Sequence, residues 1–594
     1  MILKRYPLII LLLFSVILNA QEDLVAREYF INGEFEKALT SYKKLYNKNT
    51  NNTNYLLQLV KIEQQLELYK DAETRLLEVI NTNNYPELLV ELGYNYNLQN
   101  DSISANKYYN KAIATLDDNT NNAYRVGRTF ENLSLLNQAI TTYKKAMTLN
   151  PSLEFNMQLA RIYGTQGEVE KMFESYIDLV ETSDSYLNTI KRSISEFITD
   201  DDSNENNIFL KKILLKKIQQ TQDLKWNELL SWLFIQQKDY NKAFAQEKAI
   251  YKRQMQSLNR LVELGLIAEN QKQYDDAIAV FNYIIDNTQD IDTKLVGHLK
   301  VLQIKTKIAT PSDYHDIKNK YETVLETYGK TPQTLSLQIN YAHFLAFNFN
   351  EEDQAILILK NTLKYKLSEY DLAPVKLELG DILILKEKFN EALIYYTQIE
   401  RNLKNSTIAQ EARFKIAKAS YYKGDFKWAE SQLKILKSST SQLTANDALD
   451  LKLLISDNRA EDSLQVALTK YAKADLLAFQ NKNDQAITIL NSILEEHKTE
   501  VIIPQALLKQ AKLFEIKKEY QNAKVNYQLI ITDFKDSILM DNALYNLAEL
   551  LVNHLNQPEE AKQLYEELLF NHSDSIYAVD ARKKFRALRG DTLN

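Results

Sequence analysis

Apolar positions recur at helical spacing, in pairs of short segments, along nearly the whole chain. The pattern is clearest over residues 123–152, where apolar side chains three or four positions apart form one face of each of two segments. Gly127 and Ala139 put small residues where two antiparallel helices have to approach closely. Pro151 ends the second segment, because proline cannot continue a helix. These residues therefore predict a helical hairpin.

The hairpin repeats about every 34 residues. The small residue of the second segment recurs as Ala38, Ala72, Ala105, Ala139 and Met172, and each is followed four positions later by a large residue: Tyr42, Leu76, Tyr109, Tyr143 or Tyr176. Each hairpin leaves an apolar face that only the next hairpin can cover, so stacking is expected. The pattern resembles the tetratricopeptide repeat (TPR) over residues 23–588. This resemblance implies an all-α fold, a TPR helix–turn–helix superhelical solenoid of about fourteen to fifteen units.

Changes in the repeat spacing divide the chain into predicted segments. An N-terminal TPR array covers residues 21–184, and the pattern blurs over residues 185–225, which we interpret as a degenerate repeat or hinge. A central array follows over residues 226–440. A C-terminal array over residues 441–590 begins with an extra helix around residues 445–455 and ends in a capping helix with a basic outer side.

The N-terminus has the features of a signal peptide. Lys4 and Arg5 precede an apolar run over residues 7–18, and Ala20 offers a small residue for cleavage. The run is shorter than the roughly 20 apolar residues that a membrane span needs. We therefore expect residues 1–20 to be removed and the protein to be exported to the periplasm, with no transmembrane span afterwards; an uncleaved anchor is the alternative.

The C-terminal repeats carry a second, narrower resemblance, over residues 484–588. The segment 533–537 (DFKDS) precedes the helical segment 541–548 (DNALYNLA), and 571–575 (NHSDS) stands in the same place before the last helix. These repeats are similar to those of two bacterial envelope proteins, the Tol–Pal-associated periplasmic coordinator and the TPR lipoprotein of the outer-membrane assembly machine. The acylated cysteine of that lipoprotein is missing here. The resemblance implies a cell-envelope role, with peripheral association to the outer membrane.

Composition supports helices and argues against catalysis. Only 11 Gly and 8 Pro occur in 594 residues, which is too few for the turns of a large β protein. Cysteine is absent, and the six histidines show no metal-ligand spacing. No nucleotide-binding loop or nucleophile motif is present, and interspersed charges with a net of −7 do not suggest nucleic-acid binding. We predict no enzyme activity, no cofactor and no metal site. The alternative is a metal or catalytic site in the irregular stretches 185–225 and 440–460.

The TPR resemblance also indicates candidate binding residues. In TPR proteins the residue after the small residue of the first helix tends to face the concave surface. In the first five repeats these positions are Arg27, Lys61, Tyr94, Arg128 and Arg161, of which four are basic. In later repeats they are Trp232, Leu266, Asp381, Lys418, Asp475, Lys512 and Glu549, which share no common sign.

Two interpretations of the basic row remain. Basic residues are common on exposed helix faces, and Glu131 and Glu154 are candidates for bridging them, which would make the row structural. Alternatively, residues 21–180 bind an acidic peptide segment or chain terminus, whose carboxylates the arginines hold bidentately. The expected function is thus a non-enzymatic periplasmic scaffold or adaptor for peptide segments or partner proteins. An accessory role in outer-membrane assembly or in the cell-wall and division machinery is the alternative within that class.

Cleavage of the signal peptide gives the first testable prediction. Mass spectrometry of the protein from a bacterial host should find a mature N-terminus at Gln21, in the periplasmic fraction. An intact Met1 in the inner-membrane fraction would show that the segment is kept as an anchor.

Overall fold

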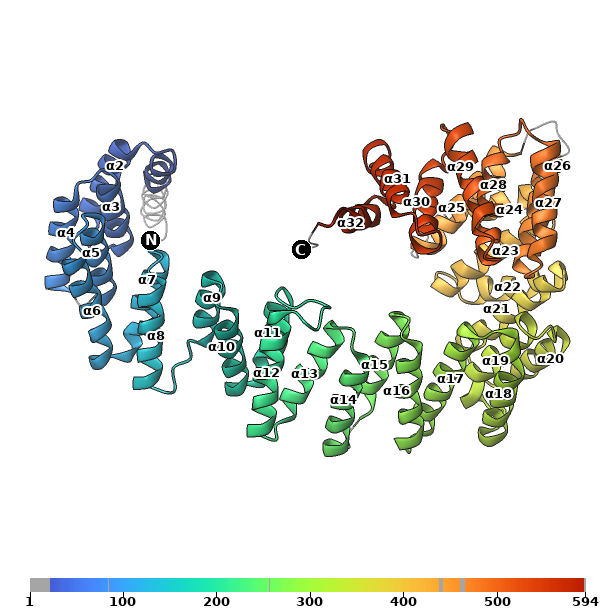
Figure 1. The fold of residues 1–594 in the computed structure, drawn as a ribbon, viewed down its shortest axis with the longest axis horizontal. Helices are drawn as coiled ribbons and strands as arrows, with labels where there is room; N and C mark the ends of the chain where they lie inside the picture. Colours follow the sequence, from blue (N-terminus) through green and yellow to red (C-terminus); the bar gives the residue numbers. More distant parts are fainter. Residues whose placement is uncertain (1–21, 84, 256, 437–441, 460–464, 592–594) are drawn as a thin grey trace, which may run out of the picture. The chain divides into compact units, whose positions relative to one another are not determined.

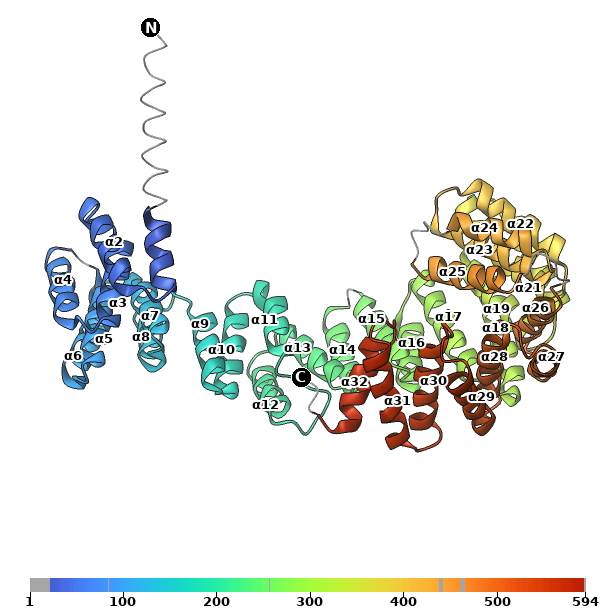
Figure 2. The same cartoon turned by 90° about the horizontal axis from the view of Figure 1, so that it is seen from above.

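The computed structural model describes residues 22–83, 85–255, 257–436, 442–459 and 465–591. These residues form helices joined by turns and short loops, and no strand occurs among them (Figures 1 and 2). In the same part of the chain, no helix is long and apolar enough to cross a membrane. The chain divides into two compact units, Met1–Ser257 (unit 1) and Leu258–Asn594 (unit 2), which are treated separately below.

Unit 1 begins with a helix over residues 22–31. It continues with α2 (Phe35–Lys48), α3 (Thr53–Gln65), α4 (Tyr69–Thr82), α5 (Pro86–Leu98), α6 (Ser102–Asp118), α7 (Ala123–Asn132), α8 (Leu136–Leu149), α9 (Asn156–Gln166), α10 (Val169–Thr182), α11 (Leu187–Ser195), α12 (Glu205–Gln220), α13 (Leu224–Gln236) and α14 (Tyr240–Gln254). Short 3₁₀ helices, Thr120–Asn122 and Asp184–Tyr186, lead into α7 and α11.

Unit 2 contains α15 (Asn259–Asn270), α16 (Tyr274–Asn287), α17 (Ile291–Ile308), α18 (Tyr314–Tyr328), α19 (Leu335–Phe347), α20 (Glu352–Thr362), α21 (Glu369–Leu385), α22 (Phe389–Asn402), α23 (Thr407–Tyr422), α24 (Phe426–Leu436), α25 (Gln442–Asp457), α26 (Val466–Phe479), α27 (Asn483–Glu496), α28 (Ile503–Ile516), α29 (Tyr520–Asp533), α30 (Met540–Asn553), α31 (Pro558–Asn571) and α32 (Ala578–Arg589). Two 3₁₀ helices, Pro311–Asp313 and Pro332–Thr334, precede α18 and α19.

Within each unit the helices pack as successive antiparallel pairs, each pair also contacting the next. α25 and α32 stand outside this pairing, the first between two pairs and the second at the end of the array. The predicted all-α solenoid of helix pairs is therefore confirmed. Residues 185–225 contain α11 and α12, which both pack against α10. The boundary between the two compact units lies farther along the chain, after Ser257. A hinge at 185–225 stays a prediction.

The two helices of a pair approach closely where the first helix carries glycine. A Cβ atom on Gly127 of α7 would lie 2.4 Å from Cε1 of Tyr143 on α8, so the tyrosine ring occupies the space a side chain would need. Ala139, the other small residue expected at a crossing, is fully buried. The same contact joins Gly93 to Tyr109, Gly265 to Phe281 and Gly380 to Tyr396. Small residues on one helix and aromatic residues on its mate therefore form the core of these pairs.

The turns between paired helices use a left-handed residue, usually not glycine. Ser134, between α7 and α8, has φ 57°, and Glu387, between α21 and α22, has the same value. Such a residue lets backbone N–H groups satisfy the last carbonyls of the first helix: Leu135 N–H, for example, bonds the carbonyl of Phe130 at 2.8 Å. The closing hydrogen bonds offset the cost of a left-handed non-glycine residue, which is of order 1–2 kcal/mol. This explains how the chain makes so many tight turns with so few glycines.

The glycine–tyrosine contact gives the second prediction. Gly127→Ala should weaken the α7–α8 pair by about 1–3 kcal/mol, because the new methyl group overlaps the Tyr143 ring. Hydrogen exchange of α7 and α8 amides should speed up, and the melting temperature should fall. Gly164→Ala, on α9, is the matched control. Its methyl group would meet only the flexible Met172, 3.0 Å away at Sδ, so helix propensity should leave this variant neutral or slightly stabilised. Unchanged exchange in the Gly127 variant would contradict the assignment of the close contact.

Candidate functional site: inner-face residues of the two units

The predicted row of unit 1 lies on the first helices of five consecutive pairs. Arg27 is in the helix over residues 22–31, and the others follow on α3, α5, α7 and α9: Lys61, Tyr94, Arg128 and Arg161. The three arginines are exposed, whereas Lys61 and Tyr94 are half-buried. Among the described residues, neither Arg27 nor Lys61 forms an ion pair or side-chain hydrogen bond. Two of the basic residues thus remain able to bind a ligand carboxylate.

The other two basic residues of the row have partners within the protein. Arg128 donates a hydrogen bond of 2.5 Å to the hydroxyl of Tyr124, and its guanidinium lies over that ring. Arg161 forms an ion pair with Glu131, whose second oxygen accepts a 2.6 Å hydrogen bond from Tyr143. Glu131 is therefore one bridge of the kind expected from the sequence. It holds Arg161 across neighbouring repeats and leaves Arg128 without a carboxylate.

Glu154, the second expected bridge, has a different role. Its Oε1 accepts a 2.7 Å hydrogen bond from the backbone N–H of Asn156, at the start of α9. The carboxylate thus satisfies a free amide in the first turn of a helix. The interpretation of Glu154 as a bridge to the arginines is not supported by these contacts.

A buried carboxyl group lies beside the middle of the row. Glu91 on α5 is only 5% exposed, and its Oε2 has no hydrogen-bond partner among the described residues. Burial raises the pKa of Glu91 to about 7, while the ammonium of Lys61 acts in the opposite direction. On α6, the buried hydroxyl of Tyr109 also has no partner among the described residues, and burial, with smaller contributions from Tyr94 and Glu91, raises its pKa. The sequence analysis did not identify Glu91. An acidic residue two positions before the glycine of a first helix was the available signal.

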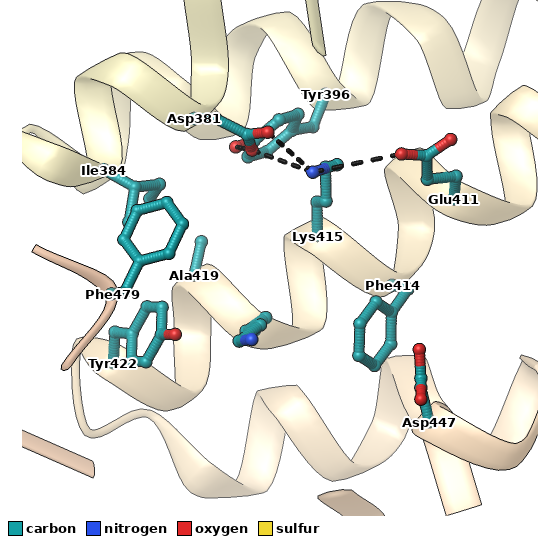
Figure 3. Close-up of a pocket in the computed structure, with 11 residues that line it drawn as sticks. Asp381, Ile384, Tyr396, Glu411, Phe414, Lys415, Ala419, Tyr422, Asp447 and Phe479 are labelled. Atoms are coloured by element: carbon teal, nitrogen blue, oxygen red, sulfur yellow. Dashed lines mark hydrogen bonds and ion pairs between the residues drawn. The ribbon is translucent and has the colours of Figure 1, made fainter. Parts of the chain in front are cut away.

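Unit 2 contains two adjoining cavities that the sequence analysis did not locate. The smaller, of about 300 Å³, is lined by residues of α21, α22, α23, α25 and α26 (Figure 3). In Figure 3, Lys415 points to Asp381, which it contacts at 2.7 Å, and Tyr396 donates a 2.6 Å hydrogen bond to the same carboxylate. The larger cavity, of about 550 Å³, extends from α23 and α25 to α26, α28, α30 and the turn before α32. Phe414, Lys418 and Asp447 line both.

Four of the seven inner-face positions inferred for the later repeats line these cavities. Asp381, Lys418, Asp475 and Lys512 all do so, on α21, α23, α26 and α28. Asp475 is paired with Lys509. Burial and the nearby Lys509 lower the pKa of Lys512, whereas burial and Asp447 raise the pKa of Asp450 on α25. The mixed signs seen in the sequence therefore belong to one hollow surface in which opposite charges face one another.

A metal cluster is absent from the described residues. They contain no group of three or more His, Cys, Asp or Glu side chains placed to hold a metal ion. The stretch 185–225 forms helices and a capped loop, where Asp201 accepts hydrogen bonds from Ser203 and Asn204 caps α12. Of the stretch 440–460, residues 440, 441 and 460 lie outside the described residues, and the rest is mainly α25.

Comparisons with known proteins agree with the arrangement in helix pairs. Residues 121–153 and 542–575, which correspond closely to the pairs α7–α8 and α30–α31, match family models described as tetratricopeptide repeat. The chain contains tetratricopeptide repeats. Such repeats stack into extended surfaces that typically bind other proteins. A comparison with curated proteins found no sequence match.

Two solved structures are similar to the chain over most of its length. One belongs to the APC/C hetero-tetramer Cut9–Hcn1, with 12% identity, 96% of each chain covered and a TM-score of 0.24. The other is Naa15/Naa10 bound to HypK-THB, with 10% identity, 97% of this chain and 94% of that chain covered, and a TM-score of 0.29. At these values neither structure indicates what this chain binds.

The third prediction compares two tyrosines at equivalent repeat positions. Tyr143→Phe should destabilise the α7–α8 pair by about 1–2 kcal/mol, because its hydroxyl hydrogen-bonds the Glu131 carboxylate. Tyr109→Phe should be neutral or slightly stabilising, because the buried hydroxyl that it removes has no hydrogen-bond partner among the described residues. Amide hydrogen exchange of the two helix pairs, together with melting temperatures, measures both effects. Equal destabilisation by the two substitutions would contradict this difference in hydrogen bonding.

Proposed function

We propose that this chain is a non-enzymatic scaffold in which the TPR helices of unit 1 bind an acidic segment or chain terminus of a partner protein. The observation that carries the proposal is the set of basic residues on successive first helices. Arg27, Lys61 and Arg128 have no carboxylate partner among the described residues, although 79 acidic side chains are present in the whole chain. Cations that are not neutralised internally attract anionic ligands and steer their approach.

The cellular setting of this scaffold is part of the proposal. We place it in the bacterial periplasm, where it supports a cell-envelope complex. The support for this is the basic and apolar N-terminal segment over residues 1–20 and the likeness of residues 484–588 to repeats of envelope proteins. Both arguments come from sequence, so the periplasmic location and the envelope role stay predictions.

The fourth prediction tests capture of an acidic segment. A rhodamine-labelled peptide of ten glutamates should bind the mature chain, and a peptide of ten glutamines with the same label should not. The triple variant Arg27→Gln, Lys61→Gln, Arg128→Gln should bind about tenfold more weakly or worse, because three cations at roughly 0.5–1 kcal/mol each are lost. Fluorescence anisotropy at several salt concentrations measures the affinity, which should fall as salt rises.

A second triple variant controls for the loss of charge alone. Lys70, Lys111 and Lys144 are exposed lysines on the second helices α4, α6 and α8 of the same unit. Replacing these three by glutamine changes the net charge equally but leaves the row intact, so binding should stay within about twofold. If both triple variants bound the ten-glutamate peptide equally weakly, the loss of affinity would be explained by overall charge and not by the row. Full affinity in the first variant would refute the proposed site.

A further inference from the structure

The inference concerns the regulation of the unit 1 site and rests on the function proposed above. We propose that protonation of Glu91 controls the capture of an acidic segment at Lys61. When the Glu91 carboxyl is neutral, the Lys61 ammonium is available to a ligand carboxylate. When the carboxyl is ionised, it neutralises the same ammonium from within the protein and repels the ligand. Binding of an anion therefore takes up a proton from solvent onto the Glu91 carboxylate.

The burial of Glu91 and the effect of the Lys61 charge on it support this coupling. Lys61 on α3 and Tyr94 on α5 are consecutive members of the row, and Glu91 is on the same helix as Tyr94, one turn earlier. Glu91 is almost completely buried, and no hydrogen bond in the described part of the chain satisfies its Oε2. A buried carboxylate without hydrogen-bond donors is costly, so the neutral form is favoured. Lys61 is the cation that opposes this effect.

Several other charged groups of the surrounding helices have partners of their own. On α4, Glu73 accepts a hydrogen bond from Tyr96, and Arg75 pairs with Glu63 of α3 at 2.7 Å. On α7, Arg125 contacts Glu87 at 3.5 Å. Arg128, also on α7, is held by the Tyr124 hydroxyl, and α6 contributes the neutral Tyr109. Lys61 is the cation whose charge acts on the Glu91 carboxyl group.

The pH range over which the affinity should change is set by the pKa of the Glu91 carboxyl group. Burial raises the pKa of Glu91 from 4.5 to about 7, so its charge changes within the range in which most proteins are stable. All six histidines of the chain lie in unit 2, so unit 1 has no other side chain that ordinarily titrates between pH 6 and 8. A nearby ligand anion stabilises the protonated form further. Affinity should consequently rise as the pH falls through about 7.

The fifth prediction measures this linkage with the rhodamine-labelled ten-glutamate peptide and the full mature chain. The wild type should bind about three- to tenfold more tightly at pH 6 than at pH 8, as a ligand-induced pKa shift of about one unit requires. Glu91→Gln should bind at pH 8 nearly as tightly as the wild type does at pH 6, with little pH dependence. Calorimetry in buffers of different ionisation enthalpy should show proton uptake on binding to the wild type at pH 7, and much less for Glu91→Gln.

Two variants and one stability measurement complete the test. Glu78→Gln removes an exposed carboxylate from α4 and should keep the pH dependence of the wild type, whereas Lys61→Gln should weaken binding and flatten its pH profile. The stability that the protonated Glu91 provides is complete below pH 4.5 and is lost as the pH rises through about 7. Glu91→Gln should therefore melt above the wild type at pH 8 but not at pH 5, which shows that it folds.

The outcomes separate this inference from the function on which it rests. No binding of the ten-glutamate peptide at any pH would refute the proposed function. Binding that is equally pH-dependent in the wild type and in Glu91→Gln would leave the proposed function in place and overturn the role of Glu91. If Glu91→Gln changed the melting temperature but not the pH profile of binding, the role of Glu91 in binding would likewise be overturned, because a purely structural role predicts that result.

Discussion

The close approach of two helices within each pair is the constraint on which the solenoid depends. Where the first helix carries glycine, as at Gly127, the aromatic ring of the second helix fills the space that a side chain would need. The ring is large and apolar, so it buries much surface at the place where the two backbones come nearest. Each pair must also cover the apolar face of its neighbour. A substitution that separates the two helices of a pair would therefore weaken the packing within that pair and its packing against the next pair.

The same tyrosines connect the core to the charges of the inner surface. Tyr143 packs on Gly127 and donates its hydroxyl to Glu131, which also holds Arg161 of the next pair. This arrangement recurs in unit 2, where Tyr396 donates to Asp381 and Lys415 of the next pair contacts that carboxylate. Some charges on successive first helices therefore serve to fix neighbouring repeats. A charge with no such partner, such as Arg27 or Lys61, is the better candidate for binding a ligand.

The cavities of unit 2 show how an extra helix changes a repeat surface. Of the side chains described in α25, only Ala448 and Ile455 are buried, and Leu451 and Leu454 border the larger cavity. Across that cavity, Ile538 and Ile576 are 65% and 85% exposed. α25 packs mainly on α24 and so covers only part of the surface formed by the later first helices.

The sequence by itself determined the helix pairs, because small residues such as Ala139 and large ones such as Tyr143 recur with a fixed period that only stacked hairpins satisfy. Lys418 and Lys512, two of the positions that the TPR resemblance assigns to the inner face, line a unit 2 cavity, while the inner-face assignment of the row stays a prediction. Only the tertiary structure decided which charges have partners, because Glu131 and Arg161 meet across repeats at a spacing that many other pairs share. Burial was likewise decided by the tertiary structure: the position of Glu91 two residues before Gly93 indicates a helix crossing, but only the packing of neighbouring helices buries its carboxyl group and raises its pKa to about 7.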